Sequence, residues 1–233
     1  MRALILQHEE PTPPGHVIEW LEGHGAEFEV FRIDLEDREV DPRDYDLIVS
    51  LGSEFAAYDD SHAFVPREAR LMRRAVDEDV PVLGLCFGGQ MLARVLGGEV
   101  FRGEEAEIGW LPVRTRDPDL VPEGPWFQWH FDVITAPPGA DVIAETDLGA
   151  QAFVAGRHLG LQFHPEVTPE IMDEWVRAYR HELDAEGVDP DTLLEETNRD
   201  ADEHKRTSWR LLEGYLGRVA GLAAPAADEE AAG

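Results

Sequence analysis

The chain has 233 residues, and an apolar content of 43% supports a sizeable core in one large domain with an appendage. Its formal net charge of −29 comes from 49 acidic and 20 basic residues. Such a surface repels phosphate backbones and anionic lipid, so we expect neither a nucleic-acid nor a membrane partner.

The first residues, MRALILQHEE, carry a short apolar run followed by acid, which is not the pattern of a signal peptide. The single cysteine of the chain excludes an intramolecular disulfide. No stretch approaches the roughly 20 uninterrupted apolar residues that are needed to cross a bilayer. These features predict a cytoplasmic protein.

Short apolar runs alternate with amphipathic segments through residues 1–100. Near-continuous apolar runs are typical of strands in a parallel sheet that is covered on both faces. They are ALIL (3–6), FEVFRI (28–33), DLIVSLG (46–52) and PVLGLC (81–86). Apolar residues at helical spacing lie between them, in residues 15–24, in the segment after Pro66 and in residues 88–96. This alternation predicts an α/β fold with right-handed crossovers.

From about residue 108 the pattern changes to short strands with Pro and Gly turns. The expected strands are IGWLPVRT, FDVITAPPGA, DVIAET, QAFVAG and HLGLQFHPE, and the last two form a hairpin at Gly156–Arg157. Thr168 and Pro169 predict the N-cap and first turn of a helix that reaches Tyr179. Leu211 to Val219 predict a further helix, and the tail AAPAADEEAAG is expected to be disordered.

Cys86 lies where the strand PVLGLC meets the helix GGQMLARVL. Gly84 and Gly88 flank it, which is the pattern of a nucleophile elbow: small neighbours permit a strained turn that lifts the reactive atom clear of the backbone. The positive end of the following helix favours the thiolate form. A lone cysteine is more often a small buried hydrophobic residue, but a buried structural cysteine needs neither the flanking glycines nor the following helix.

His164 ends the run LGLQF and precedes Pro165, which favours extended geometry and stops the strand. In an extended segment Glu166 lies on the same face as His164, where its carboxylate can orient the imidazole as the third member of a triad does. Active sites in open α/β sheets gather at the carboxyl ends of strands. We therefore expect His164 and Cys86 to meet there.

GLCFGGQ (84–90) followed by HPE (164–166) resembles the triad-type (class I) glutamine amidotransferases over residues 1–176. The glutaminase domain of GMP synthase and its stand-alone relatives are the most similar members, because EIGW (107–110) and WHFD (129–132) are also present. The two motifs together are specific for this family, whereas either motif alone is weak evidence.

The resemblance implies a three-layer, flavodoxin-like α/β fold with a mostly parallel central sheet flanked by helices. It divides the chain into an amidotransferase domain (1–176), a C-terminal helical extension (177–222) and a tail (223–233). It also implies that Cys86 attacks the amide carbon of glutamine to form a γ-glutamyl thioester, that His164 is general base and acid, and that Glu166 orients His164.

The resemblance also implies the oxyanion hole and substrate contacts. One backbone donor is the amide of Phe87, and the other is that of Gly52 or Ser53. This choice stays open, because relatives generally carry two glycines and often a proline where this chain reads Gly-Ser-Glu. Gln90 contacts the substrate, and His130, Phe131 and Asp132 lie near its amino and carboxylate ends. Gly89 replaces a frequent histidine, with little expected effect.

Two other patterns favour simpler interpretations. Asp59, Asp60 and His62 could be imagined as metal ligands, but no second cluster completes such a site, so we expect a polar loop and no metal or cofactor. Trp126 and Trp129 are expected in the core or a pocket wall rather than as a platform for stacking bases.

Three functions remain open at this stage. The first is glutamine hydrolysis that supplies ammonia to a separate synthetase, since this length leaves no room for an ATP-binding synthetase domain. The second is a γ-glutamyl hydrolase that acts on γ-glutamyl amines or conjugates without a partner. The third is an inactive regulatory or binding homologue, against which the intact Cys86, His164 and Glu166 argue. The last helix is expected to pack on the domain, with an interface to a partner or a second copy as the alternative.

Overall fold

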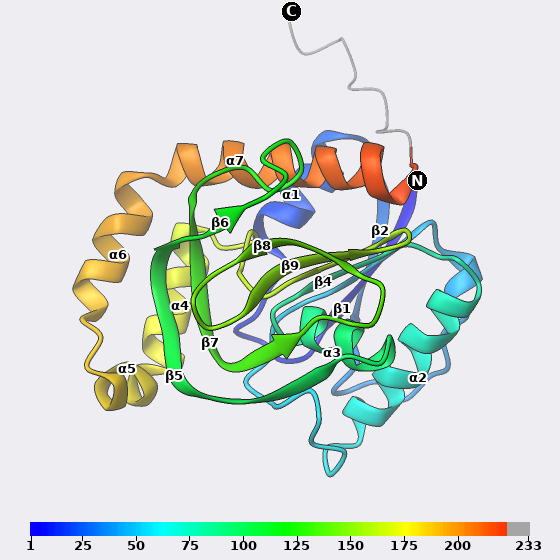
Figure 1. Cartoon of the computed structure of the whole chain (residues 1–233), viewed down its shortest axis with the longest axis horizontal. Coiled ribbons are helices and arrows are strands. Elements are labelled where there is room, and N and C mark those ends of the chain that lie inside the picture. The colour runs from blue at the N-terminus through cyan, green and yellow to red at the C-terminus, as the bar shows by residue number, and fades with distance from the viewer. Residues whose placement is uncertain (223–233) are drawn as a thin grey trace, which may run out of the picture.

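A mixed, mostly parallel sheet forms the centre of the computed structural model, which describes residues 1–222 (Figure 1). Its eight strands have the order β2-β1-β3-β4-β10-β9-β8-β6. They are β1 (Arg2–Gln7), β2 (Glu27–Arg32), β3 (Leu47–Ser50), β4 (Val82–Leu85), β6 (Arg114–Thr115), β8 (Asp141–Glu145), β9 (Ala150–Ala155) and β10 (His158–Leu161). The strands from β2 to β10 pair in parallel, and β10, β9, β8 and β6 pair antiparallel. The predicted α/β class is confirmed.

The parallel strands are the predicted apolar runs. Every residue of β3 and β4 is buried, as expected for strands that are covered on both faces. The hairpin at Gly156–Arg157 is also confirmed, because β9 and β10 pair on either side of it.

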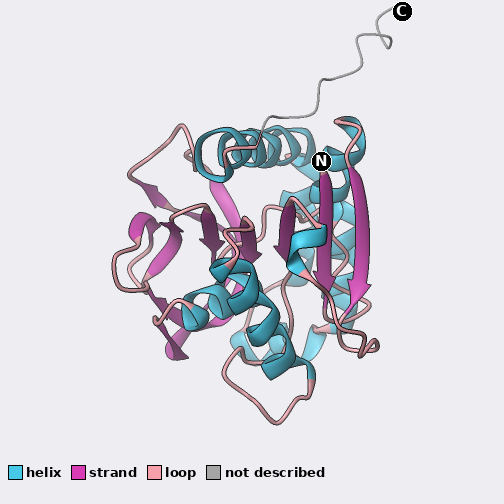
Figure 2. Cartoon of the chain, turned by 90° about the vertical axis from the view of Figure 1, so that its right-hand side faces the viewer, coloured by secondary structure: helices cyan, strands magenta, loops and turns pink. Residues whose placement is uncertain are grey.

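Helices cover both faces of this sheet (Figure 2). On one face lie α1 (Gly15–Gly23), α7 (Ala201–Gly214) and a π-helical turn, η2 (Tyr215–Ala220). On the other lie α2 (Phe64–Asp77) and α3 (Phe87–Val95), with the short 3₁₀ turn η1 (Pro42–Asp44) beside α2. The helix α2 begins at Phe64, two residues before the Pro66 after which the sequence predicts helical spacing. Proline is tolerated throughout a first turn, whose N–H groups lack intrahelical partners.

A second, two-stranded sheet stands beside the first. It pairs β5 (Glu99–Pro112) with β7 (Pro125–Thr135) antiparallel, with a register shift between Arg102 and Glu107. The expected strand IGWLPVRT is therefore divided between β5 and β6, and the expected start of the next strand at Phe131 was too late. The WHFD segment lies inside β7.

The C-terminal part contains more helices than predicted. After α4 (Pro169–Ala178), which Thr168 caps by accepting a hydrogen bond from the Ile171 N–H at 3.3 Å, come α5 (Arg180–Glu186) and α6 (Pro190–Arg199) before α7. Leu211 and Tyr215 share a hydrophobic cluster with strands β1, β3 and β4, so α7 and η2 pack on the sheet, whereas α5 and α6 join a separate cluster with α4 and β7. The expected disordered tail (223–233) lies outside the described residues. None of the helices in residues 1–222 combines the length and apolar composition that spanning a bilayer requires.

Candidate active site

Cys86 occupies a strained turn between β4 and α3. Its backbone has φ 50° and ψ −107°, a conformation that costs an L-residue free energy and persists only where the surroundings fix it. The surroundings are tight: a Cβ on Gly84 would lie 2.3 Å from the Gly88 carbonyl oxygen, and a Cβ on Gly88 would lie 2.2 Å from the Ser50 carbonyl oxygen. Glycine is therefore required at both positions, and the turn has the form of a nucleophile elbow.

His164 follows the end of β10, the strand that neighbours β4. Its Nδ1 lies 2.7 Å from Glu166 Oε1, and both side chains are buried. Its Nε2 has no hydrogen-bond partner within residues 1–222 and lies close enough to the Cys86 sulfur for the two groups to interact electrostatically. The backbone oxygen of Glu166 accepts a hydrogen bond from the His16 N–H at 3.0 Å, which fixes the segment against the start of α1.

The electrostatics of this group favour a charged imidazole. Burial alone would lower the pKa of His164, but the Glu166 carboxylate and the neighbouring Cys86 sulfur raise it to about 10. At neutral pH the ring is therefore an imidazolium, which is the partner that a thiolate nucleophile needs.

A cavity of about 140 Å³ opens beside the sulfur. A cavity needs roughly 10–15 Å³ for each water molecule, so this one holds a molecule the size of an amino acid. Eight of the residues expected at the site line it: Gly52, Ser53, Cys86, Gln90, His130, Phe131, Asp132 and His164. Glu166 lies behind His164, and Phe87 turns its side chain into the core, so that its contribution to the site is its backbone.

The two expected sources of backbone donors lie close to the sulfur. Phe87 is the first residue of α3, so its N–H has no intrahelical acceptor. Gly52 follows the end of β3, and a Cβ there would lie 2.8 Å from His164 Cε1 and 3.7 Å from Cys86 Cβ. No larger residue fits between the nucleophile and the histidine.

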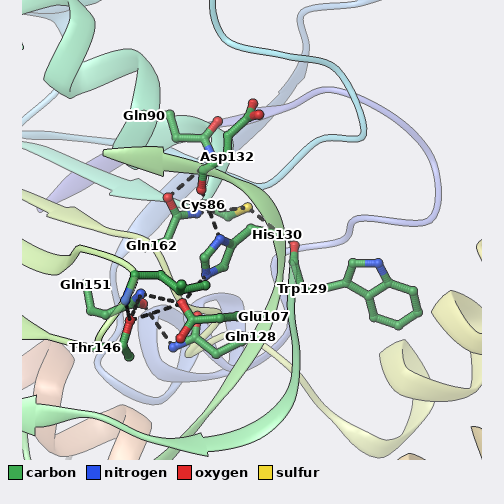
Figure 3. Close-up of polar contacts among 11 residues, drawn as sticks. Cys86, Gln90, Glu107, Gln128, Trp129, His130, Asp132, Thr146, Gln151 and Gln162 are labelled. Carbon is green, nitrogen blue, oxygen red and sulfur yellow. Dashed lines mark hydrogen bonds and ion pairs between the residues drawn. The ribbon is translucent and has the colours of Figure 1, made fainter. Parts of the chain in front are cut away.

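Gln90 and Gln162 lie on the floor of the site. Gln162 Nε2 lies 3.7 Å from the Cys86 sulfur, and its Oε1 accepts a hydrogen bond from Gln90 Nε2 at 3.4 Å (Figure 3). Gln162 was not predicted from the sequence. The signal was present, because Gln162 is two residues before His164 and an extended chain places both on one face.

Charged side chains from β5 and β7 line the far end of the cavity. Burial raises the pKa of Asp132, which accepts a hydrogen bond from the Tyr58 hydroxyl at 3.3 Å, while Arg102 lowers it. The Arg102 guanidinium lies 4.1 Å from the centre of the Phe131 ring. The cavity thus presents a carboxylate and a guanidinium near each other. Arg102 was not predicted from the sequence; it lies in the site because the pairing of β5 with β7 places it directly opposite Asp132.

A buried polar network supports His130 from behind (Figure 3). His130 Nε2 lies 3.1 Å from Glu107 Oε2, and its Nδ1 lies 3.0 Å from the Asp132 carbonyl oxygen. Glu107 also accepts hydrogen bonds from Gln151 Nε2 at 2.8 Å and from the Thr146 hydroxyl at 3.2 Å. These contacts fix the orientation of the β7 segment that carries His130, Phe131 and Asp132.

The remaining sequence patterns lie elsewhere. Asp60 pairs with Arg94 at 2.8 Å, and Asp59 lies 3.5 Å from His62, so these groups form surface ion pairs. Trp126 stacks on Phe163 in the core, with 4.6 Å between ring centres. Trp129 lines the cavity and donates a hydrogen bond from its indole N–H to Glu182 at 2.7 Å.

Comparison of the chain with known proteins identifies one family. The family described as "Glutamine amidotransferase class-I" matches residues 16–178. The chain is 38% identical over 160 residues to the "GMP synthase [glutamine-hydrolyzing]" of Thermus thermophilus, covering 60% of this chain and 30% of that protein. It is 34% identical to one subunit of the glutamine-hydrolyzing GMP synthase of Sulfurisphaera tokodaii, covering 54% of this chain and 69% of that protein. The chain thus spans about a third or less of the full-length GMP synthases that it matches.

Solved structures match over a larger share of the chain. A glutamine amidotransferase from Thermotoga maritima is 32% identical with a TM-score of 0.85, covering 92% of this chain and 97% of that one. A glutamine amidotransferase from Methylobacillus flagellatus is 28% identical with a TM-score of 0.86, covering 97% and 96%. The similarity therefore includes the C-terminal helices.

Proposed function

Because the chain belongs to the class I glutamine amidotransferase family, we propose that it hydrolyses the side-chain amide of glutamine through a γ-glutamyl thioester on Cys86. The observation that carries this proposal is that the buried Cys86 thiol and the His164 imidazole lie on the wall of one cavity the size of an amino acid, with the Glu166 carboxylate behind the imidazole. Cys86, His164 and Glu166 are the proposed catalytic triad.

The raised pKa of His164 determines the order of proton transfers. The Cys86 thiolate attacks the amide carbon, and the carbonyl oxygen becomes an oxyanion that accepts backbone hydrogen bonds. The His164 imidazolium then donates its proton to the leaving nitrogen, the C–N bond breaks and ammonia departs. The ring, now neutral, takes a proton from the attacking water. The S–C bond breaks, glutamate leaves, and the ion pair forms again.

The far end of the cavity fits the α-amino-acid end of glutamine. We propose that the Asp132 carboxylate binds the α-ammonium group and that Arg102 binds the α-carboxylate. A bound ammonium group would favour the charged form of Asp132 against the burial that raises its pKa. Gln90 and the β7 segment then hold the substrate between these charges and the sulfur.

An assay of the purified chain with glutamine and a panel of γ-glutamyl amides tests this proposal. We expect release of glutamate and ammonia in equal amounts from glutamine. A chain that releases neither product from any of these substrates, alone or together with its synthetase, would contradict the proposal.

One observation favours γ-glutamyl amines as a second candidate substrate class. Glu54 and Glu182 line the cavity together with the rings of Trp129 and Tyr179. Carboxylates and aromatic faces attract a cationic group. A higher kcat/KM for a γ-glutamyl diamine than for glutamine would make the second candidate the better description.

We further propose that the ammonia passes to a separate synthetase. The support is the similarity to a protein that is named as one subunit of a glutamine-hydrolyzing GMP synthase. The synthetase partner and its acceptor substrate are part of this proposal.

A diazo-ketone analogue of glutamine should label the site. Cys86 is the single cysteine of the chain, and its sulfur lines the cavity, so we expect one adduct per chain, located on Cys86. Intact-mass measurement and peptide mapping check this, and excess glutamine should slow the labelling. An adduct mapped to another residue would contradict the assignment.

A further inference from the structure

The buried pair His8 and Glu68 lies directly behind the loop that follows β3. His8 Nε2 lies 2.6 Å from Glu68 Oε2, and neither side chain is exposed. Glu68 Oε1 accepts a second hydrogen bond from the Ser50 hydroxyl at 2.6 Å. The His8 ring is enclosed by aromatic side chains, with its centre 4.6 Å from that of Phe87 and 5.6 Å from that of Phe64. The proposed mechanism assigns no role to this pair.

The other ring nitrogen of His8 points at the catalytic loop. Its Nδ1 lies 3.1 Å from the Gly52 carbonyl oxygen, which can only accept a hydrogen bond, so Nδ1 carries a proton. Burial alone would lower the pKa of His8, but Glu68 and the Gly52 carbonyl raise it above the ordinary value. Nδ1 therefore donates to the loop, while Nε2 lies against the Glu68 carboxyl group.

This contact fixes the direction of a peptide group. The N–H and C=O of a trans peptide point in opposite directions. Because the Gly52 carbonyl points at the buried His8 ring, the N–H of the same peptide, that of Ser53, points away from that ring. The preceding carbonyl, that of Leu51, accepts a hydrogen bond from the Gly88 N–H at 3.1 Å. These two hydrogen bonds hold the loop of Gly52 and Ser53 against the core on one side and against α3 on the other.

We infer that His8 and Glu68 are positioning residues that anchor the Gly52 carbonyl and so hold the loop of Gly52 and Ser53 beside the Cys86 sulfur, where its backbone donor, together with the Phe87 N–H, meets the oxyanion. This inference rests on the proposed hydrolysis at Cys86. Stability alone does not require the pair, since an apolar pair of similar shape is often as stable as a buried ion pair.

The double variant His8→Phe/Glu68→Gln tests the inference. Phenylalanine keeps the ring among its aromatic neighbours but cannot donate to Gly52, and glutamine keeps an acceptor for Ser50 without leaving an unpaired buried charge. We expect kcat for glutamine to fall about 100-fold, the loss typical of a missing oxyanion donor, with KM little changed. The variant His8→Gln, which can still donate to Gly52, should recover part of this loss.

Alkylation of Cys86 by iodoacetamide distinguishes a misplaced oxyanion donor from a general disturbance of the active site. This displacement forms no oxyanion, so its second-order rate constant should be the same in the variant and the original chain. The variant His158→Phe is the matched control, because His158 is also buried but lies at the far end of β10 from His164. It should leave kcat and alkylation unchanged.

The outcomes distinguish the two proposals. An unchanged kcat in the double variant, or equal losses of kcat and alkylation, would overturn the positioning role alone. If the double variant does not fold, Glu68→Gln alone is measured in the same way, and a normal kcat there would overturn the role. An original chain that is alkylated at Cys86 but inactive on both glutamine and γ-glutamyl p-nitroanilide would instead refute the proposed function, and this inference with it.

Discussion

Replacing Cys86 with alanine should lower kcat for glutamine by about a million-fold, the loss seen when the nucleophile of a hydrolytic triad is removed. Alanine has no sulfur, so no thioester can form, and the oxyanion donors and the substrate contacts remain without a reaction to assist. Sensitive detection of glutamate release over many hours checks this result. Turnover within ten-fold of the original chain, about 1.4 kcal/mol in the activation barrier, would exclude Cys86 as the nucleophile.

A second substitution at the same position controls for folding. Glycine normally costs about 0.5–1 kcal/mol relative to alanine in regular structure. The backbone of Cys86 has a positive φ, which glycine adopts without strain and alanine does not. Cys86→Gly should therefore have a free energy of unfolding at least equal to that of Cys86→Ala, measured by denaturant titration. A clearly less stable glycine variant would show that the turn is not strained.

The parallel half of the sheet could be predicted from the sequence because β1, β3, β4 and β10 are short, largely apolar and buried, and the edge strand β2 still alternates with aromatic residues. The tight turn at Cys86 could be predicted because glycines on both sides of it indicate a backbone that passes within van der Waals distance of its neighbours. Thr168 could be predicted as an N-cap because its residue type and the proline that follows it are local signals of a helix start.

The rest depended on contacts between distant segments. His8 and Glu68 are 60 positions apart, and nothing local indicates that a buried histidine at the end of β1 reaches a glutamate on α2. Arg102 enters the site because β5 pairs with β7 and places it opposite Asp132, and nothing local in the sequence indicates that pairing. The helix boundaries after α4 do have local signals, which the sequence analysis did not use. Gly187, in a left-handed conformation, ends α5, and Asp189–Pro190 begins α6.

The loop that follows β3 shows the difference between local sequence signals and contacts between distant segments. The segment Gly52-Ser53-Glu54 differs from the family pattern, and its residues alone allow either amide. The hydrogen bonds that the two flanking carbonyls accept, from Gly88 and His8, hold the peptides of this loop in their orientation. Side-chain identity places the loop near the nucleophile, whereas long-range hydrogen bonds decide how its peptides are oriented.

Replacing Glu166 with glutamine should lower kcat by about 10⁴-fold with little effect on KM, by analogy with loss of the orienting carboxylate in a serine protease triad. The carboxylate accepts from His164 Nδ1 at 2.7 Å and so holds Nε2 toward the sulfur. Glutamine can offer its NH₂ group instead, which favours the opposite tautomer. Steady-state kinetics on glutamine measure the change. The matched control is Glu170→Gln, a nearby exposed carboxyl on α4, which should leave kcat unchanged.

The pH dependence distinguishes an electrostatic role of Glu166 from a merely structural one. The pKa of His164 is raised from 6.5 to about 10, so the proton that it donates to the leaving nitrogen is present at neutral pH and is lost only as the pH approaches 10. The alkaline limb of kcat/KM should therefore lie near pH 10 in the original chain and move to lower pH in Glu166→Gln, because one of the two negative charges that raise this pKa is gone. Stability should follow the same sign. The contribution of His164 to the free energy of unfolding is fully present below pH 6.5 and is lost between 6.5 and about 10, and this loss should be smaller in the variant. An alkaline limb that stays in place while kcat falls would mean that Glu166 supports the fold of the segment rather than the charge of the imidazole.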